Sequence, residues 1–187
     1  CLIAVFTDNS DDKNFPPGKK QYTLDFAYHG GIYRDVWMIA KSPVAITDAI
    51  EANKIAGGGV FVHYDNISEK SADVFVDTDV KNESKQSKTV YLETELCDKA
   101  GKVIAREKTK LVLANGESKT AKQKITVRKP NFWSPDAPYL YKINSRILDG
   151  IVSLDGGTTR IGIRKAEFRG KDGFYLNGKP YGQLIGA

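Results

Sequence analysis

The sequence predicts an all-β protein whose main domain is an immunoglobulin-like antiparallel β-sandwich. Runs of alternating or β-branched residues recur at intervals of about 8–12 residues, as they do in all-β sandwiches. Clusters of turn-forming residues separate these runs. No long stretch has the period of about 3.6 residues that marks a helix. Residues 43–56 come closest, but they hold only one Ile46–Ile50 repeat, and we interpret them as a strand or a linker.

The expected strands follow one another along the whole chain. Besides a strand over the apolar segment 30–38, they occupy residues 23–29, 59–65, 71–80, 89–96, 102–114, 121–127, 139–148 and 159–168. Turn signals fall at residues 81–86, 98–102, 113–118, 154–157 and 170–173. Within residues 71–80, Val74, Val76 and Val80 share one parity with Thr78, which predicts one inward and one outward face.

Basic residues give the chain a formal net charge of +5, and they are densest in residues 119–129, which hold five cations and no acid. Lys122, Lys124 and Arg128 alternate there with smaller or apolar residues. We interpret this run as a half-solvated strand whose lysines discourage pairing at a sheet edge. Polyanion binding is the alternative. Aromatic residues are not interleaved with the cations, so we expect no nucleic-acid partner.

Cysteine, histidine and hydropathy exclude several other classes of protein. Cys1 and Cys97 are too few for a disulfide framework, and His29 and His63 have no partners at metal-ligand spacing. No apolar run approaches the roughly 18 residues that a membrane-spanning helix needs. We therefore expect no membrane span.

The segment Pro130–Tyr141, "PNFWSPDAPYLY", is the most distinctive local feature. Its prolines fix φ near −65° and restrict the residues before them, which predicts a stiff turn leading into an aromatic strand. Trp133 is a large apolar side chain suited to closing the end of a sandwich, and we assign it a structural role.

Three blocks in this order resemble the middle of glycoside hydrolase family 2 enzymes, the β-galactosidase-like group. They are residues 16–39 with "GGIYRDVWMI", residues 131–141 followed by "RIGIRKAEF", and residues 173–187, "GFYLNGKPYGQLIGA". The resemblance implies three parts. Residues 1–45 would be the last strands of a sugar-binding jelly-roll domain, 46–165 the immunoglobulin-like sandwich, and 166–187 a linker and the first strand of a catalytic (β/α)₈ barrel.

Arg34 and Asp35 are unusual inside the apolar run 30–38, because burying either charge alone is costly. On a strand they would point to opposite faces and need separate partners. We expect Arg34 to be structural, at a domain junction. The resemblance implies that Asp35 binds the sugar and a sodium ion, and an interdomain salt bridge is the alternative. Gly30 and Gly31 predict a positive-φ bend or a close backbone approach.

The catalytic groups of a retaining glycosidase are two carboxyl groups about 5–5.5 Å apart. The resemblance places both glutamates on later barrel strands, downstream of Ala187. Glu83, Glu93, Glu95 and Glu117 fall in turns or on outward strand positions. We therefore expect this chain to carry no catalytic residue and no cofactor of its own. Whether the parent enzyme binds sodium or magnesium elsewhere stays open.

Two functions from different classes remain open. The first is a non-catalytic segment of a β-galactosidase that acts on β-galactosides. The second is a stand-alone sandwich for carbohydrate binding or adhesion. The strand-like ends "CLIAVF" and "QLIGA" favour the first, and they also favour self-association of the segment. We expect Trp37 and Trp133 to be buried, which disfavours an aromatic binding platform. The compartment stays open, although export would suit a parent that degrades polysaccharides.

Overall fold

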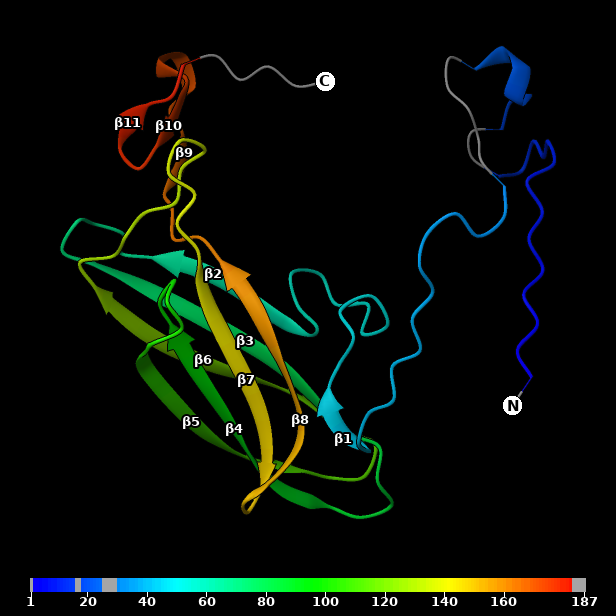
Figure 1. Cartoon of the computed structure of the whole chain (residues 1–187), viewed down its shortest axis with the longest axis horizontal. Coiled ribbons are helices and arrows are strands. Elements are labelled where there is room, and N and C mark those ends of the chain that lie inside the picture. Colours follow the sequence, from blue (N-terminus) through cyan, green and yellow to red (C-terminus); the bar gives the residue numbers. More distant parts are fainter. Residues whose placement is uncertain (1, 16–17, 25–29, 183–187) are drawn as a thin grey trace. The chain divides into compact units, whose positions relative to one another are not determined.

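The computed structural model describes residues 2–15, 18–24 and 30–182 of the chain. Inter-residue contacts divide the chain into two compact units, Cys1–Ala40 and Lys41–Ala187. All strands of the described residues belong to the larger unit, and the smaller one contains one 3₁₀ turn, η1 (Gln21–Thr23). The larger unit is the all-β, antiparallel sandwich that the sequence predicts (Figure 1).

The first sheet of the sandwich is built around β3 (Ser71–Asn82). One edge of β3 pairs with β6 (Ser118–Arg128), while β2 (Val60–Asp65) and β1 (Val44–Ile46) follow each other along its other edge. All three pairings are antiparallel. In β6 the odd-numbered residues from Ala121 to Val127 are buried, and the lysines and arginine between them are exposed. The predicted half-solvated edge strand is therefore confirmed.

The second sheet has the strand order β5-β4-β7-β8. Its members are β5 (Val103–Leu113), β4 (Lys88–Cys97), β7 (Tyr141–Asp149) and β8 (Val152–Ile161). The chain alternates between the two sheets after β3 and again after β5 and β6, as immunoglobulin-like connections do. Cys97 is buried at the end of β4, where the sequence places a small residue.

The core between the sheets consists of two apolar clusters, one toward each end of the strands. The first cluster contains Val74 and Val76 of β3 with Leu96 and Ile143 from the facing sheet, all fully buried. The second contains Val80 of β3 with Val90, Leu92 and Ile147, also fully buried. The period-2 pattern of the sequence thus places these side chains inward as predicted.

The turn expected at residues 154–157 is not a turn, because these residues lie within β8. The chain reverses instead at Gly150, which has a φ of +60°, between β7 and β8. Gly156 marks a close approach of two backbones. A Cβ on Gly156 would lie 2.8 Å from the carbonyl oxygen of Ser145. The glycine at position 156 thus allows β7 and β8 to pack closely and does not reverse the chain.

Residues 166–182 form a small separate sheet of order β11-β10-β9. It contains β9 (Ala166–Phe168), the 3₁₀ turn η2 (Gly170–Asp172), β10 (Phe174–Leu176) and β11 (Lys179–Pro180). The single strand expected over 159–168 is therefore two strands, the end of β8 and β9. Phe174 packs against Phe168 and Tyr181, with ring centroids 5.1 and 5.9 Å apart.

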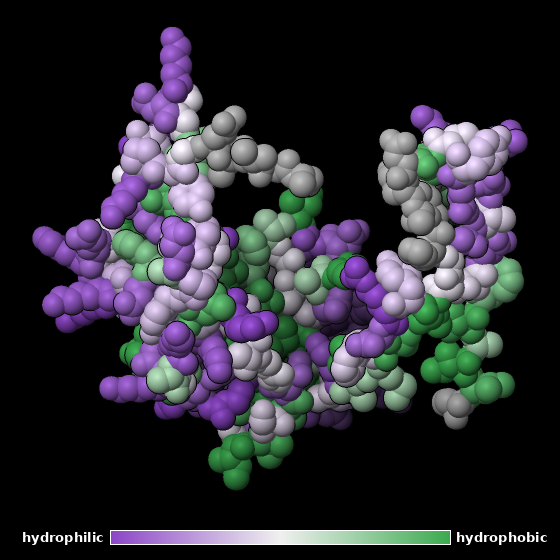
Figure 2. Space-filling model, turned by 45° about the horizontal axis from the view of Figure 1, so that its top comes forward, coloured by the Kyte–Doolittle hydropathy of each residue, from purple (hydrophilic) through white to green (hydrophobic). Residues whose placement is uncertain are grey.

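The strand expected over residues 30–38 is absent, since residues 30–43 have no regular secondary structure. The same is true of residues 2–10, and most of the strand expected over 23–29 lies outside the described residues. A strand needs a hydrogen-bonded neighbour, and the described part of residues 2–40 forms no sheet. Figure 2 shows hydrophobic side chains of this unit at its surface.

Candidate functional site

Asp35 and Arg34 lie in the smaller unit, in an irregular stretch with exposed side chains. Because no strand forms there, the two side chains do not occupy opposite faces of a strand, contrary to the sequence prediction. The Arg34 guanidinium lies 5.5 Å from the centre of the Tyr33 ring. Trp37 was expected to be buried, but it is 80% exposed, since no apolar layer of the described residues covers it. Asp35 is thus presented to the surroundings of this unit rather than enclosed by it.

The two glycines before this stretch have the geometry that the sequence predicts. Gly31 has a φ of +81°, in the region that favours glycine. Gly30 touches the Asn9 side chain so closely that a Cβ would lie 2.5 Å from its Cγ. The backbone of Gly30, at the start of the segment that carries Asp35, therefore lies against the Asn9 side chain. His29 lies outside the described residues.

Trp133 joins the sandwich to the small C-terminal sheet instead of filling the core. Its ring packs on Gly162, where a Cβ would lie 2.7 Å from the Trp133 Cγ. The Arg164 guanidinium lies 5.2 Å from the ring centre. The Trp133 carbonyl accepts a hydrogen bond of 3.0 Å from Asn177 Nδ2. Asn177 Oδ1 in turn accepts one of 3.0 Å from the Lys165 amide. Trp133, expected to be buried, is only half-buried at this junction, while Phe132 and Tyr139 pack against the core.

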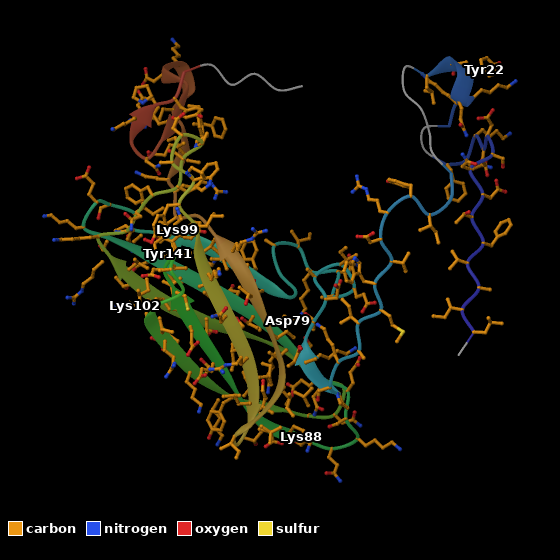
Figure 3. All side chains as sticks on the ribbon, viewed as in Figure 1. Tyr22, Asp79, Lys88, Lys99, Lys102 and Tyr141 are labelled. Carbon is orange, nitrogen blue, oxygen red and sulfur yellow. The ribbon has the colours of Figure 1, made fainter. Side chains whose placement is uncertain are left out.

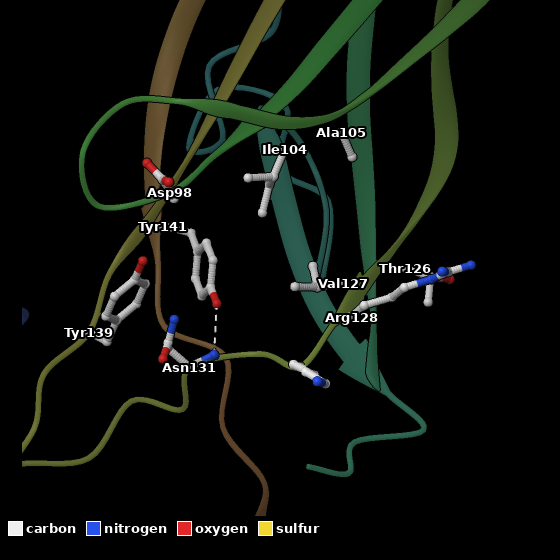
Figure 4. A pocket seen from close by; sticks show the side chains of 10 residues that line it. Asp98, Ile104, Ala105, Thr126, Val127, Arg128, Asn131, Tyr139 and Tyr141 are labelled. Atoms are coloured by element: carbon white, nitrogen blue, oxygen red, sulfur yellow. Dashed lines mark hydrogen bonds between the residues drawn. The ribbon is translucent and has the colours of Figure 1, made fainter. Parts of the chain in front are cut away.

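A cavity of about 430 Å³ lies at the end of the sandwich, between the turn after β4 and the connection from β6 to β7 (Figure 4). The Tyr141 hydroxyl accepts a hydrogen bond of 2.8 Å from the Asn131 amide, and the Tyr139 hydroxyl accepts one of 3.3 Å from the Lys99 amide. Tyr141 begins β7 and holds the chain ten residues upstream, which resembles the tyrosine corner of immunoglobulin-like domains. Burial raises the pKa of Tyr141. These contacts hold the connection in place.

Asp79 on β3, labelled in Figure 3, is a buried carboxylate that the sequence did not reveal. Its alternation on β3 predicts a solvated position, yet it is 1% exposed. Lys54 Nζ lies 2.6 Å from Oδ1, and hydroxyls of Thr47, Ser118 and Thr120 donate at 2.9–3.0 Å. Burial pushes the pKa of Asp79 upward, but these hydrogen bonds outweigh burial and leave the pKa lowered. Asp79 thereby fastens the segment between β1 and β2 to the sheet.

Asp73, six residues earlier on β3, is a second anchored carboxylate. It accepts hydrogen bonds from Asn66 Nδ2 at 2.8 Å and Thr126 Oγ1 at 2.7 Å, and Lys124 Nζ lies 2.9 Å away. The bonds from Asn66, Thr126 and Lys124 lower the pKa of Asp73 to about 2. Both acids are therefore ionised structural acceptors, unlike a catalytic acid, whose pKa is raised.

Two further acids of the sandwich, Glu93 and Glu95, are engaged in surface ion pairs with arginines. Arg146 lies 2.6 Å from Glu93 and 3.6 Å from Glu95 on the outer face of the second sheet. Arg106 also pairs with Glu95. The described residues contain no group of three acidic, histidine or cysteine side chains that could hold a metal ion. They likewise include no helix with the length and hydropathy to cross a bilayer.

The chain is similar to known glycosidases along most of its length. Residues 54–164 match the family Glycosyl hydrolases family 2. A beta-glucuronidase of Formosa agariphila is 33% identical over 184 residues, covering 95% of this chain and 18% of that protein. A beta-galactosidase of Thermoanaerobacter pseudethanolicus is 30% identical over 179 residues, covering 96% of this chain and 22% of that protein.

Solved structures agree with these sequence relatives. Beta-glucuronidase 2 of Bacteroides uniformis superposes with a TM-score of 0.79 at 28% identity, over 94% of this chain and 20% of that one. A family 2 member from Bacteroides cellulosilyticus gives a TM-score of 0.66 at 31% identity, over 73% of this chain and 18% of that one. The chain thus spans about a fifth of the length of the relatives that it matches.

Proposed function

Because the chain belongs to glycosyl hydrolases family 2, we propose that it is a non-catalytic segment of a β-glycosidase that positions neighbouring domains around a sugar site. The observation that carries this proposal is the match of the sandwich to that family over residues 54–164. The junction made by Trp133, Gly162 and Asn177 supports it, because it fixes the C-terminal sheet against the end of the sandwich.

The acids of the chain support a positioning role rather than a catalytic one. Asp73 and Asp79 are held ionised by hydrogen bonds, and Glu93 and Glu95 are paired with arginine. A retaining glycosidase needs one carboxyl group that delivers a proton and one that attacks the sugar. In this proposal both of those groups come from the rest of the parent enzyme.

Asp35 is the residue of this chain that we propose to contact the sugar. Its exposed carboxyl group can accept hydrogen bonds from sugar hydroxyls. It also offers oxygen to a hard cation such as sodium, but it supplies a single ligand. The described residues contain no group of three acidic, histidine or cysteine side chains that could complete such a site around Asp35. The sodium role of Asp35 therefore stays a prediction that needs ligands from elsewhere in the parent enzyme.

We propose a β-galactoside as the substrate of the parent enzyme, since Asp35 suits a neutral sugar with free hydroxyls. A β-glucuronide is the second candidate, because the Formosa relative named a beta-glucuronidase is 33% identical to the chain. A glucuronide carries a carboxylate and calls for cationic groups near it. The two candidates therefore differ in the charge that the site must accept.

The test uses the full-length parent enzyme with chromogenic β-galactoside and β-glucuronide substrates. We expect hydrolysis of the galactoside, and Asp35→Asn should lower kcat/KM by about 10- to 100-fold with Tm unchanged. Asp136→Asn, an exposed acid in the turn before β7, is the matched control and should retain full activity. Full activity of Asp35→Asn would show that Asp35 does not contact the sugar. Hydrolysis of the glucuronide alone would show that the substrate is a β-glucuronide and not a β-galactoside.

The mass of the native polypeptide in its source cells tests whether the chain is a segment of a larger protein. A species several times heavier than the 20.7 kDa chain is expected. A native species of 20.7 kDa would favour the stand-alone carbohydrate-binding or adhesion module instead. Size-exclusion chromatography of the chain tests the predicted self-association, which a clean monomer would contradict.

A further inference from the structure

A layer of polar side chains crosses the middle of the sandwich, between its two apolar clusters. Along β3, Thr78 falls between Val76 of the first cluster and Val80 of the second. In three other strands a polar residue likewise lies between the residues of the first cluster and those of the second. The four members of the layer are Thr78 of β3, Thr94 of β4, Gln123 of β6 and Ser145 of β7.

The register of the strands brings these residues together in two pairs. Thr94 and Ser145 are direct cross-strand partners in the second sheet. In the first sheet Thr78 pairs with Ala121 and Gln123 with Val76, so Thr78 and Gln123 are diagonal neighbours on one face.

Gln123 reaches the opposite sheet, where its Nε2 donates to Thr109 Oγ1 at 3.0 Å and to the Leu92 carbonyl at 3.4 Å. The two pairs therefore face a common interior.

One oxygen atom of each member has no hydrogen-bond partner among the described residues. These atoms are Oγ1 of Thr78, Oγ1 of Thr94, Oε1 of Gln123 and Oγ of Ser145. All four residues are at most 5% exposed. An unsatisfied buried polar group is costly, and folded proteins pair the large majority of them. Four such atoms in one layer point to a shared partner.

We propose that this layer binds one or more buried water molecules that bridge the two sheets. A water molecule donates two hydrogen bonds and accepts two, which matches three hydroxyls and one amide oxygen. The layer contains no carboxylate that would favour a cation. Thr109, which is half-buried on the edge strand β5, links the layer to the edge of the second sheet.

A high-resolution crystal structure of the chain tests the proposal directly. We expect ordered water density within about 2.7–3.2 Å of at least two of the four oxygen atoms. Direct hydrogen bonds from these oxygens to protein groups, for instance between Thr94 and Ser145, would overturn the proposal. A dry layer would overturn it equally.

Thermal unfolding of variants gives a second test. The sign of the change in Tm distinguishes a layer that binds water from a layer whose hydroxyls are unsatisfied. If water is bound, Thr94→Val removes one of its partners and lowers Tm by about 2–4 °C. If the hydroxyl is unsatisfied, the same change leaves Tm unchanged or raises it. Thr94→Ser keeps the hydroxyl and should retain the water density. Thr89→Val, at an exposed position of the same strand, controls for the substitution itself and should not shift Tm.

Discussion

The two units of the chain treat their large apolar side chains in opposite ways. In the sandwich, Leu92, Leu96 and Ile143 are fully buried between two sheets. In residues 2–40, Trp37 and Met38 are 80% and 86% exposed. The difference shows that apolar residues stabilise this fold only where a second apolar layer faces them. The smaller unit by itself encloses none of these exposed apolar side chains, and exposed apolar patches mark surfaces that bind a partner.

The largest expected effect of a substitution comes from the core of the sandwich. Leu96→Ala removes a fully buried side chain from the first cluster and should lower the free energy of unfolding by about 3 kcal/mol. Trp37→Ala, in the exposed unit, should change it by less than about 0.5 kcal/mol. Urea unfolding of both variants makes the measurement. A large loss for Trp37→Ala would break the contrast between the two units.

Removal of the Asp79 carboxylate should have the next largest effect. Asp79→Ala leaves Lys54 and three hydroxyls without their common acceptor, and should cost about 2–3 kcal/mol of unfolding free energy. Asp77→Ala, at a less buried position of β3, is the matched control, with an expected cost below about 0.5 kcal/mol. Equal losses would mean that the β1–β2 segment is held by other contacts.

The junction between the sandwich and its C-terminal sheet predicts a smaller effect. Gly162→Ala forces a methyl group against the Trp133 ring and should cost about 2 kcal/mol. In a Trp133→Gly background the same change should cost almost nothing, because both the ring and the Trp133 Cβ, which would lie 2.8 Å from the added methyl group, are gone. This double-mutant cycle measures the contact itself. Equal costs in both backgrounds would place the strain in the backbone instead.

The smallest effect appears only in acid. Asp73 has a pKa of about 2 in the folded chain, below its ordinary value of 3.8. Its ionised form therefore stabilises the fold above pH 3.8, and this contribution is lost as the pH falls from 3.8 toward 2. Asp73→Asn should flatten the fall of Tm over that window, measured by circular dichroism. Asp136→Asn should keep the wild-type slope, and an equally steep fall in Asp73→Asn would contradict the prediction.

The sequence could predict most strands of the sandwich, because these have a period-2 pattern and an apolar partner within the chain. It misplaced the turn after β7, because the "LDGG" of β8 contains more glycine than the true turn at Gly150. It missed Asp79, since alternation cannot reveal that the segment after β1 folds over the outer face of β3. The role of Asp35 depends on the groups that surround it in space, and the local sequence pattern does not specify those groups.

The ion pair between Lys54 and Asp79 also affects where a protease can cleave this chain. Trypsin must draw a lysine side chain into its own pocket before it can cut after that residue. The Lys54 ammonium is already held 2.6 Å from Asp79, in a segment whose Thr47 hydroxyl further accepts a hydrogen bond from the Gly59 amide. Cleavage after Lys54 therefore requires this segment to open first, which makes the cut a reporter of local unfolding in the sandwich.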